Sequence, residues 1–282
     1  MRQTLEKREI EEKIINEALA EDLGKLGDIT TDSIISKDLS STYNMVVNED
    51  AILGGLEVFK KTFQLLDNEI TIRSDFYDGD EIKKNSVIAT VCGNTRNILK
   101  GERTALNFLC HLSGIATITR LLVRKISNTR TKLLDTRKTT PNLRFFEKQA
   151  ILAGGAFNHR FNLSEMILIK DNHIASAGGI KNAIMQVKKS YGEEIKIEVE
   201  VTNINELNEA IPFKPSVIMF DNWVPSELQK ALKLVPNDIL AEASGQITLE
   251  NIIDYAKTGV NYISTSYMIK HANWVDFSLN AC

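Results

Sequence analysis

In the second half of the chain, short apolar runs alternate with stretches in which apolar residues recur at helical spacing. The apolar runs are TKLLDT (131–136), MILIK (166–170), IKIEVEV (195–201), SVIMFD (216–221), DILAEA (238–243) and VNYIS (260–264). The amphipathic stretches between them cover 142–153, 177–190, 204–210, 225–234 and 248–258. Strands that alternate with helices in this way predict a parallel sheet, either doubly wound or closed into a barrel.

Charged or hydroxyl residues stand at the ends of nearly all these strands. They are Asp135 with Arg137 and Lys138, Lys170 with Asp171, Glu200, Asp221, Glu242 with Ser244, and Ser264. In a parallel barrel the carboxyl ends of all strands meet at one mouth, whereas in a doubly wound sheet only the strands at the switch point meet a ligand. One strand-end charge is more often a solvated turn residue, but the joint pattern favours an incomplete α/β barrel of about six strands.

Residues 1–113 have a different pattern, which predicts a separate mixed α+β domain. A charged helical pattern over residues 1–24 is followed by turn residues and by alternating segments such as YNMVVNE and SVIATVCG. The segment 101–126 has apolar residues at helical spacing and predicts one long helix across the junction. We therefore expect an N-terminal domain at 1–113 and a catalytic barrel domain at 114–282.

Composition excludes several classes of function. The net charge of −3 provides no general attraction for nucleic acid or an anionic membrane. Three cysteines without a CxxC pair indicate neither a disulfide framework nor a zinc knuckle, and they suit a reducing cytosol. The N-terminal pattern has no apolar signal-peptide core, and no apolar run approaches the roughly 18 residues that span a bilayer. We expect a soluble protein of the cytoplasm.

Cations concentrate in the window 133–174. They are Arg137, Lys138, Arg144, Lys148, Arg160 and Lys170, and two of the four histidines, His159 and His173, lie in the same window. A guanidinium recognises carboxylate or phosphate through two parallel hydrogen bonds, and an ammonium adds a compact charge. Because like charges at one mouth repel each other while the site is empty, the cluster predicts a polyanionic ligand. We expect residues 171–173 to support the strand end rather than to act directly.

Acidic and hydroxyl groups follow the later strands. Glu200 and Asp221 end neighbouring strands, where they could share Mg²⁺ or ribose hydroxyls, or simply form ion pairs with the cations of the rim. Ser244-Gly245-Gln246 precedes a helix expected near Thr248, and Ser264-Thr265-Ser266 follows the last strand. Such turns near the last two strands of a barrel are a frequent position for phosphate.

Alternative chemistries have less support in the sequence. The motifs GxxxxGK[ST], GxGxxG, HExxH and GxSxG are all missing. Lys170 at a strand end could form a Schiff base, as in a barrel aldolase, although arginines surround it in the sequence. A protein that binds anions without catalysis is a further alternative.

Several segments together resemble the quinolinate phosphoribosyltransferase family. They are EDLGKLGDITT, GERTALNFLCHLSGIATITR, DTRKTTPNLR, GGAFNHR, LIKDNHI, IEVEV, MFDN, EASGQI and VDFSL, in this order over essentially the whole chain. The resemblance implies an N-terminal α/β sandwich domain and an incomplete α/β barrel, assembled as a homodimer or a larger assembly of dimers. It also implies that quinolinate and phosphoribosyl pyrophosphate are converted to nicotinate mononucleotide, CO₂ and pyrophosphate with Mg²⁺.

The same resemblance implies a role for each matching residue. Arg137, His159, Arg160 and Lys170 would hold the quinolinate carboxylates, Lys138 the pyrophosphate, and Glu200 and Asp221 the ribose and its magnesium. The segments around Ser244, Gly245 and Gln246 and around Ser264 and Ser266 would hold the 5′-phosphate, and Arg103 would enter the neighbouring subunit's site. Three positions depart from the family pattern, which has glycine where this chain has Asn142, Ala156 and Ser266. Transfer to nicotinate or another ring acid is the alternative within the class.

Overall fold

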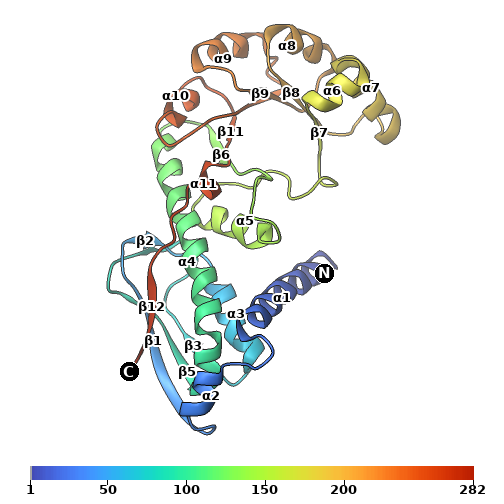
Figure 1. The fold of residues 1–282 in the computed structure, drawn as a ribbon. Helices are drawn as coiled ribbons and strands as arrows, with labels where there is room; N and C mark the ends of the chain where they lie inside the picture. The colour runs from blue at the N-terminus through green and yellow to red at the C-terminus, as the bar shows by residue number, and fades with distance from the viewer. Residues whose placement is uncertain (1) are drawn as a thin grey trace. The chain divides into compact units, whose positions relative to one another are not determined.

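Two compact units make up the protein, and neither is continuous in sequence. A computed structural model describes the backbone of residues 2–282 and the side chains from Glu9 onward. The first unit comprises Met1–Arg120, Thr139–Gly155 and Met268–Cys282, and the second comprises Leu121–Lys138 and Ala156–Tyr267. Figure 1 shows the order of their helices and strands along the chain.

The first unit is built on an antiparallel sheet in the order β12-β1-β5-β3. Its strands are β1 (Ser40–Val47), β3 (Thr71–Arg73), β5 (Val87–Asn94) and β12 (Phe277–Ala281), and β2 (Ala51–Ile52) pairs separately with β4 (Glu81–Ile82). The last strand of the chain pairs with β1, with Met45 opposite Leu279. Alternate side chains of β1 are buried, as expected for a sheet with one face on a core.

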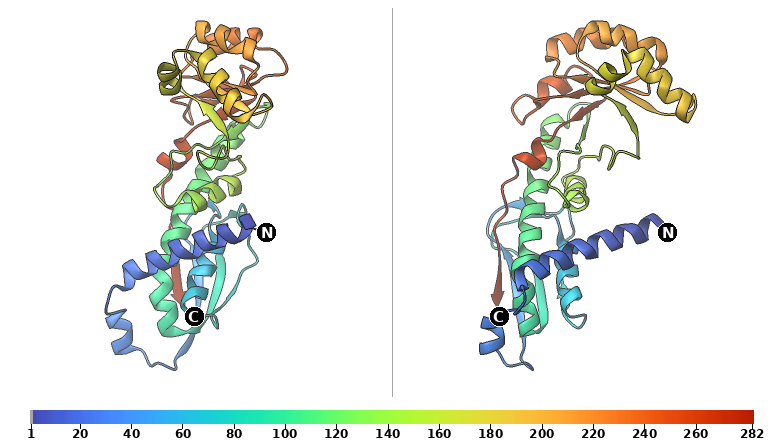
Figure 2. Two further views of the ribbon diagram at one scale, coloured as in Figure 1. Left: turned by 90° about the vertical axis from the view of Figure 1, so that its right-hand side faces the viewer. Right: turned by 45° about the vertical axis from the view of Figure 1, so that its right-hand side comes forward.

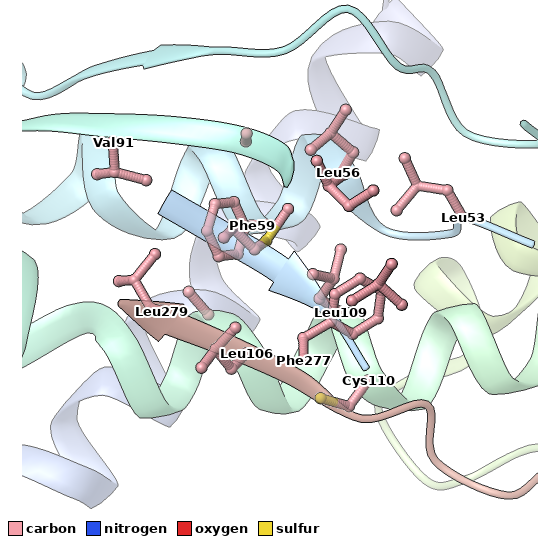
Figure 3. Close-up of a cluster of buried hydrophobic side chains, with 14 of the residues drawn as sticks. Leu53, Leu56, Phe59, Val91, Leu106, Leu109, Cys110, Phe277 and Leu279 are labelled. Atoms are coloured by element: carbon pink, nitrogen blue, oxygen red, sulfur yellow. The ribbon is translucent and has the colours of Figure 1, made fainter. Parts of the chain in front are cut away.

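Helices α3 (Leu56–Leu66) and α4 (Thr95–Ile126) pack on this sheet through buried apolar side chains. The unit also contains α1 (Arg2–Leu23), which contacts α3, and the helices α2 (Ile29–Ile34) and α5 (Arg144–Ala153). The short α11 (Tyr267–Lys270) begins at the last residue of the second unit. Figure 3 shows Leu106 and Leu109 of α4 in one cluster with Phe59 of α3 and with Phe277 and Leu279 of β12. The N-terminal helix predicted from the charge pattern is confirmed, except that Met1 lies outside the described residues.

The long helix α4 confirms the helix predicted at 101–126, although it begins earlier, at Thr95. Leu106, Leu109, Leu112 and Ile115, which recur at helical spacing, are all at most 2% exposed. One window of α4, with a mean hydropathy of 1.4, is long and apolar enough to cross a membrane, but 61% of it is buried inside the protein. Such burial is also found in the core helix of a soluble domain.

The second unit contains a six-stranded parallel sheet in the order β6-β11-β10-β9-β8-β7. The strands are β6 (Lys132–Leu134), β7 (Ile167–Ile169), β8 (Ile197–Val201), β9 (Val217–Asp221), β10 (Leu240–Ser244) and β11 (Tyr262–Ser264). All six coincide with the predicted apolar runs. The connecting helices are α6 (Asp171–Ala177), α7 (Ile180–Tyr191), α8 (Ile204–Ala210), α9 (Pro225–Ala231) and α10 (Ile252–Ala256), with 3-10 turns at Ile211–Phe213 and Leu232–Leu234.

The parallel sheet curves but does not close. Figures 1 and 2 show α6, α7, α8 and α9 side by side along one face of the sheet. The outer strands β6 and β7 are not neighbours in the sheet, and Leu134 instead forms a single parallel bridge to Phe157. The expected architecture of an α+β domain followed by an incomplete six-stranded α/β barrel is confirmed.

Candidate active site

The carboxyl edge of the parallel sheet brings a cation and two carboxylates together. Lys170 directly follows β7, Glu200 lies near the end of β8, and Asp221 ends β9. The ammonium of Lys170 lies 2.6 Å from the Glu200 carboxylate, whose side chain is only 8% exposed. Neighbouring parallel strands end at the same edge, so residues far apart in sequence meet there.

The surroundings of Glu200 act on its carboxyl in opposite directions. Burial raises the pKa of Glu200, and the hydrogen bond and charge of Lys170 oppose that rise. The negative charges of Asp221 and Asp171 raise the pKa further, so its net direction is upward. A cation that bridges the β8 and β9 carboxylates would relieve this repulsion.

The segment after Lys170 supports the strand end, as predicted. The ring nitrogen Nδ1 of His173 accepts the backbone N–H of Lys170 at 3.0 Å. This contact closes the first turn of α6 around Lys170, which is the N-cap of the helix. His173 therefore fixes the backbone of Lys170 while its own side chain remains at the surface.

Two arginines of the predicted cluster share one region of the second unit. Burial lowers the pKa of the Arg160 guanidinium, and the positive charge of Arg137 lowers it further. The Arg160 guanidinium also donates to the carbonyl of Met166 at 3.0 Å. Lys138 is exposed beside Arg137 in the segment that follows β6, and its backbone N–H donates to the hydroxyl of Thr136. Arg144 and Lys148, which the sequence pattern grouped with these cations, belong to the first unit.

His159 points into the barrel rather than toward solvent. Its side chain is 8% exposed, and its Nε2 lies 3.1 Å from the carboxylate of Glu198 and 3.7 Å from that of Glu242. Burial alone would lower the pKa of His159, but the hydrogen bond to Glu198 and the charge of Glu242 outweigh it and raise the pKa. Burial and the charge of Glu198 raise the pKa of Glu242 to about 8.

Sequence reasoning gave neither Glu198 nor Glu242 a role. Glu198 lies inside the apolar run of β8, whose pattern predicts only a strand, and Glu242 stands among the strand-end charges. The signal was present in the alternation EVEV, because residues two apart in a strand face the same side of the sheet. Glu198 and Glu200 therefore both face the barrel interior.

The loop after β10 is shaped by a close backbone approach. Gly245 has φ +93°, and a Cβ on it would lie 2.3 Å from the side-chain oxygen of Asn222, next to Asp221. The backbone N–H of Asn222 donates to the carbonyl of Ser244, and Gln246 also has a positive φ of 50°. The expected helix near Thr248 begins later, at Ile252, because the side chain of Asn251 binds the backbone on both sides of the turn at 246–248.

The serines after β11 lie in different environments. The hydroxyl of Ser264, which is 2% exposed, donates to the Glu242 carboxyl inside the barrel. Thr265 uses its hydroxyl to bind the carbonyl of Ile247, which ties the two loops together. Ser266 is half-buried. Hence Ser264 contributes to the barrel interior, while the backbone around Ser266 stands at the carboxyl edge.

Arg103 belongs to the first unit, on α4, and its side chain is exposed. The neighbouring residues Thr104, Ala105 and Leu106 are buried, so Arg103 stands on the outer face of the helix. Asn142, at a family glycine position, has φ +66°, a left-handed conformation that asparagine tolerates better than most residues. Ala156, at the other such position, is 4% exposed.

A pocket of about 690 Å³ opens at the opposite, amino-terminal edge of the parallel sheet. Residues at the strand starts, among them Lys132, Lys196 and Ser216, form its rim, and His159, Glu198 and Glu242 lie along its inner wall. The buried imidazole and carboxylates therefore lie between this pocket and the carboxyl edge that carries Lys170.

Comparisons with known proteins agree with this architecture. The model of the quinolinate phosphoribosyl transferase N-terminal domain matches residues 28–113, and that of the C-terminal domain matches residues 115–280. A protein of Bacillus subtilis named probable nicotinate-nucleotide pyrophosphorylase [carboxylating] is 42% identical over 268 residues, which cover 95% of this chain and 92% of the relative. A tobacco protein named quinolinate phosphoribosyltransferase [decarboxylating] 2b, mitochondrial, is 35% identical and covers 95% of this chain and 81% of its own length.

A solved structure leads to the same family. The nicotinate-nucleotide pyrophosphorylase from Francisella tularensis superposes with a TM-score of 0.91 at 40% identity, over 97% of this chain and 96% of the other. Both family domains are thus present, over 81–96% of the length of these relatives. The chain belongs to the quinolinate phosphoribosyltransferase family.

Proposed function

We propose that this protein converts quinolinate and phosphoribosyl pyrophosphate to nicotinate mononucleotide, CO₂ and pyrophosphate, a step of de novo NAD biosynthesis. The observation that supports this most strongly is the carboxyl edge of the barrel. Lys170 pairs there with Glu200, and Arg137 and Arg160 share one region of the same unit. Cations gathered beside carboxylates match a dicarboxylate acceptor and a pyrophosphorylated sugar in one site.

Recognition of quinolinate falls to the cations. Arg137, Arg160 and Lys170 hold the two carboxylates of the ring, and His159 directly precedes Arg160 in the chain. Each charge-assisted hydrogen bond contributes about 1.5–3 kcal/mol, so two or more of them exclude a monocarboxylate by orders of magnitude. The family glycine replaced by Ala156 does not add a charged group to the site.

The sugar phosphate occupies the later strand ends. Lys138 neutralises the pyrophosphate as it leaves, and the turns at Ser244-Gly245-Gln246 and Ser264-Thr265-Ser266 hold the 5′-phosphate. In the second turn we assign the contact to the backbone and Ser266, because the Ser264 hydroxyl already donates to Glu242. Glu200 and Asp221 bind the ribose hydroxyls.

The residues present fit a magnesium ion. Glu200 and Asp221 offer hard carboxylate oxygens from neighbouring strands, and their mutual repulsion favours a shared cation. When bound there, the ion supplies positive charge to the ribose and pyrophosphate oxygens. The alternative is that these two acids only form ion pairs with the cations of the rim. Glu200 does form such an ion pair, with Lys170.

The charges suit both halves of the reaction. As the bond between the ribose C1 and the pyrophosphate breaks, the sugar becomes cation-like, and the carboxylates of Glu200 and Asp221 stabilise it. The ring nitrogen of quinolinate then bonds to C1. Loss of the neighbouring carboxylate as CO₂ leaves an electron pair on the ring carbon, which Arg137 and Arg160 stabilise until a proton replaces the carboxylate.

Arg103 extends the proposal to a homodimer. Because Arg103 is exposed on α4 in the first unit, we assign it to the active site of a neighbouring subunit, so that two copies share their sites. The dimer is a minimum, and dimers could build into a larger assembly. We assign the protein to the cytoplasm, in keeping with its three cysteines that form no disulfide among the described residues.

Product analysis tests the proposal. Purified protein with Mg²⁺, phosphoribosyl pyrophosphate and quinolinate should release CO₂ and nicotinate mononucleotide in equal amounts, and removal of Mg²⁺ with a chelator should stop both. Lys138→Ala should retain quinolinate binding and lose turnover. Absence of product from the unaltered protein would reject the function. Equal turnover of nicotinate would reassign the acceptor to monocarboxylates, and borohydride trapping of a carbonyl compound on Lys170 would indicate an aldolase.

A further inference from the structure

One histidine, His159, lies between two carboxylates and is buried inside the barrel. Glu198 and Glu242 are 1% and 2% exposed, and both reach Nε2 of His159 from different strands. Burial of such groups without partners is unfavourable. They must therefore either form hydrogen bonds with each other or bind a ligand. The local geometry distinguishes these two roles.

The other ring nitrogen of His159 is also engaged. Nδ1 accepts the backbone N–H of Arg160 at 2.7 Å, so this nitrogen carries no proton. When the ring is neutral, its proton is therefore on Nε2, which donates it to Glu198, and this fixes the tautomer. A ring held at both nitrogens has no donor left to offer to a substrate.

These contacts lock the backbone that carries Arg160. The backbone N–H of His159 donates to the carboxylate of Asp135 at 2.7 Å, and Asp135 is completely buried. The backbone N–H of Arg160 is held by the His159 ring, and its guanidinium by the carbonyl of Met166. The segment 159–160 is thus fixed by Asp135 and Met166 from outside and by the contact between the His159 ring and the Arg160 backbone within it.

Charge adds a second link between the buried cluster and the cations. Arg160 is repelled by Arg137 and attracted by Glu198. A guanidinium placed beside another cation would otherwise turn toward solvent. Glu198 is therefore able to orient Arg160 both through the His159 ring and through its own charge.

We propose that Glu198 and Glu242 are positioning residues that hold the His159 ring, and through it Arg160, in the orientation that binds the acceptor carboxylate. This inference rests on the proposed function for the identity of the acceptor. It assigns His159 an indirect role: the ring orients Arg160 and does not itself touch the substrate. Glu242 also receives the Ser264 hydroxyl, so it links the acceptor side of the site to the strand that precedes the proposed phosphate turn.

Substitutions separate positioning from simple stability. Glu198→Ala removes the partner of Nε2, and we expect the KM for quinolinate to rise about 10- to 100-fold, as for the loss of one charge-assisted hydrogen bond, with little change in the KM for phosphoribosyl pyrophosphate. Glu198→Gln retains an oxygen acceptor at the same place but lacks the charge, so it should restore part of the loss. Glu242→Ala should raise both KM values, because Ser264 also loses its partner.

A control variant matches the loss of stability without touching the cluster. Leu228→Ala leaves a cavity under α9 in the same unit, where Leu228 is completely buried. We expect it to lower the melting temperature and leave both KM values unchanged. If Glu198→Gln is as impaired as Glu198→Ala, or if Leu228→Ala produces the same KM pattern, the positioning role is wrong.

A measurement without substrate keeps this test independent of the proposed function. Nitrogen-15 NMR of the histidines in the unliganded protein, recorded at a pH at which His159 has lost its second proton, should show His159 as the Nε2–H tautomer, and Glu198→Ala should abolish that preference. An Nδ1–H tautomer in the unaltered protein would overturn the inference, and so would a stoichiometric metal ion on His159 found by elemental analysis. If the NMR result holds but no nicotinate mononucleotide is formed, only the proposed function fails.

Discussion

The ammonium of Lys170 lies 2.6 Å from the carboxylate of Glu200, across the edge at which β7 and β8 end. The side chain of Lys170 is 42% exposed and that of Glu200 only 8% exposed. The pair therefore presents a cation to solvent while its counter-ion stays in the barrel. An incoming carboxylate can approach Lys170 from the open side without breaking the pair.

The first prediction concerns Lys170. Lys170→Met keeps the length of the side chain and removes its charge, so we expect the KM for quinolinate to rise about 10- to 100-fold, the loss of one charge-assisted hydrogen bond. Initial-rate kinetics at saturating phosphoribosyl pyrophosphate measures this change. Lys188→Met removes a surface lysine, 3.1 Å from Glu193, and serves as the control that should leave the kinetics unaltered. Similar KM values for both variants would exclude Lys170 from acceptor binding.

The second prediction concerns the pH dependence of stability. The pKa of Glu242 is about 8 in the folded protein against its usual value of 4.5, because of burial and the charge of Glu198. Between these values the folded form binds a proton that the unfolded chain releases, so this group lowers the free energy of unfolding as pH rises from 4.5 to 8. The slope is at most about 1.4 kcal/mol per pH unit.

Glu242→Gln should remove that contribution. Urea unfolding at several pH values from 5 to 9 should show the difference in stability, variant minus unaltered protein, growing in favour of the variant toward pH 8 and levelling above it. Titrating groups that do not interact with Glu242 cancel in this difference, because both proteins share them. A difference that does not change with pH would contradict the raised pKa of Glu242.

The third prediction concerns Gly245. In Gly245→Ala the new Cβ would lie 2.3 Å from the side chain of Asn222 and 2.7 Å from its backbone nitrogen, at a φ of +93°. We expect a loss of about 1–3 kcal/mol in stability and a higher KM for phosphoribosyl pyrophosphate, because the displaced Asn222 adjoins Asp221. Gly192 has the same φ of +93° but nothing within 4 Å of its Cβ position, so Gly192→Ala measures backbone strain alone. If Gly245→Ala and Gly192→Ala changed the stability and the KM equally, the contact with Asn222 would make no contribution.

The fourth prediction concerns the shared site. Arg103→Ala and Lys138→Ala subunits should each be inactive alone, but mixed dimers would contain one site with both residues intact. Random exchange of subunits makes half of the dimers mixed, so activity should return to about a quarter of that of the unaltered protein. Mass spectrometry of tagged subunits establishes that exchange has occurred. Complete exchange without recovered activity would place Arg103 in its own subunit's site or in none.

Sequence patterns were sufficient for the strand order along the chain and for several neighbours of the site. The apolar runs of β8 and β9 predicted buried strands, and the acids at their ends, Glu200 and Asp221, lie on neighbouring strands as a parallel sheet requires. The pattern did not assign a role to Glu198, because the same alternation describes a buried strand whether its interior side chains are apolar or charged. The partner of such a charge, here His159, comes from a loop whose path leaves no periodic signal.

The sequence by itself determined the elements, because helix and strand periodicities are local and the apolar positions state which face of each element is buried. It also determined the chemical types available at the strand ends, the cations near Arg137 and the acids from Glu200 onward. Only the tertiary structure decided which elements are neighbours: Phe277–Ala281 pairs with β1, near the other end of the chain, and His159 turns inward between two carboxylates. These choices depend on contacts between residues that are distant in sequence, and burial energy selects among them only when the whole chain is folded.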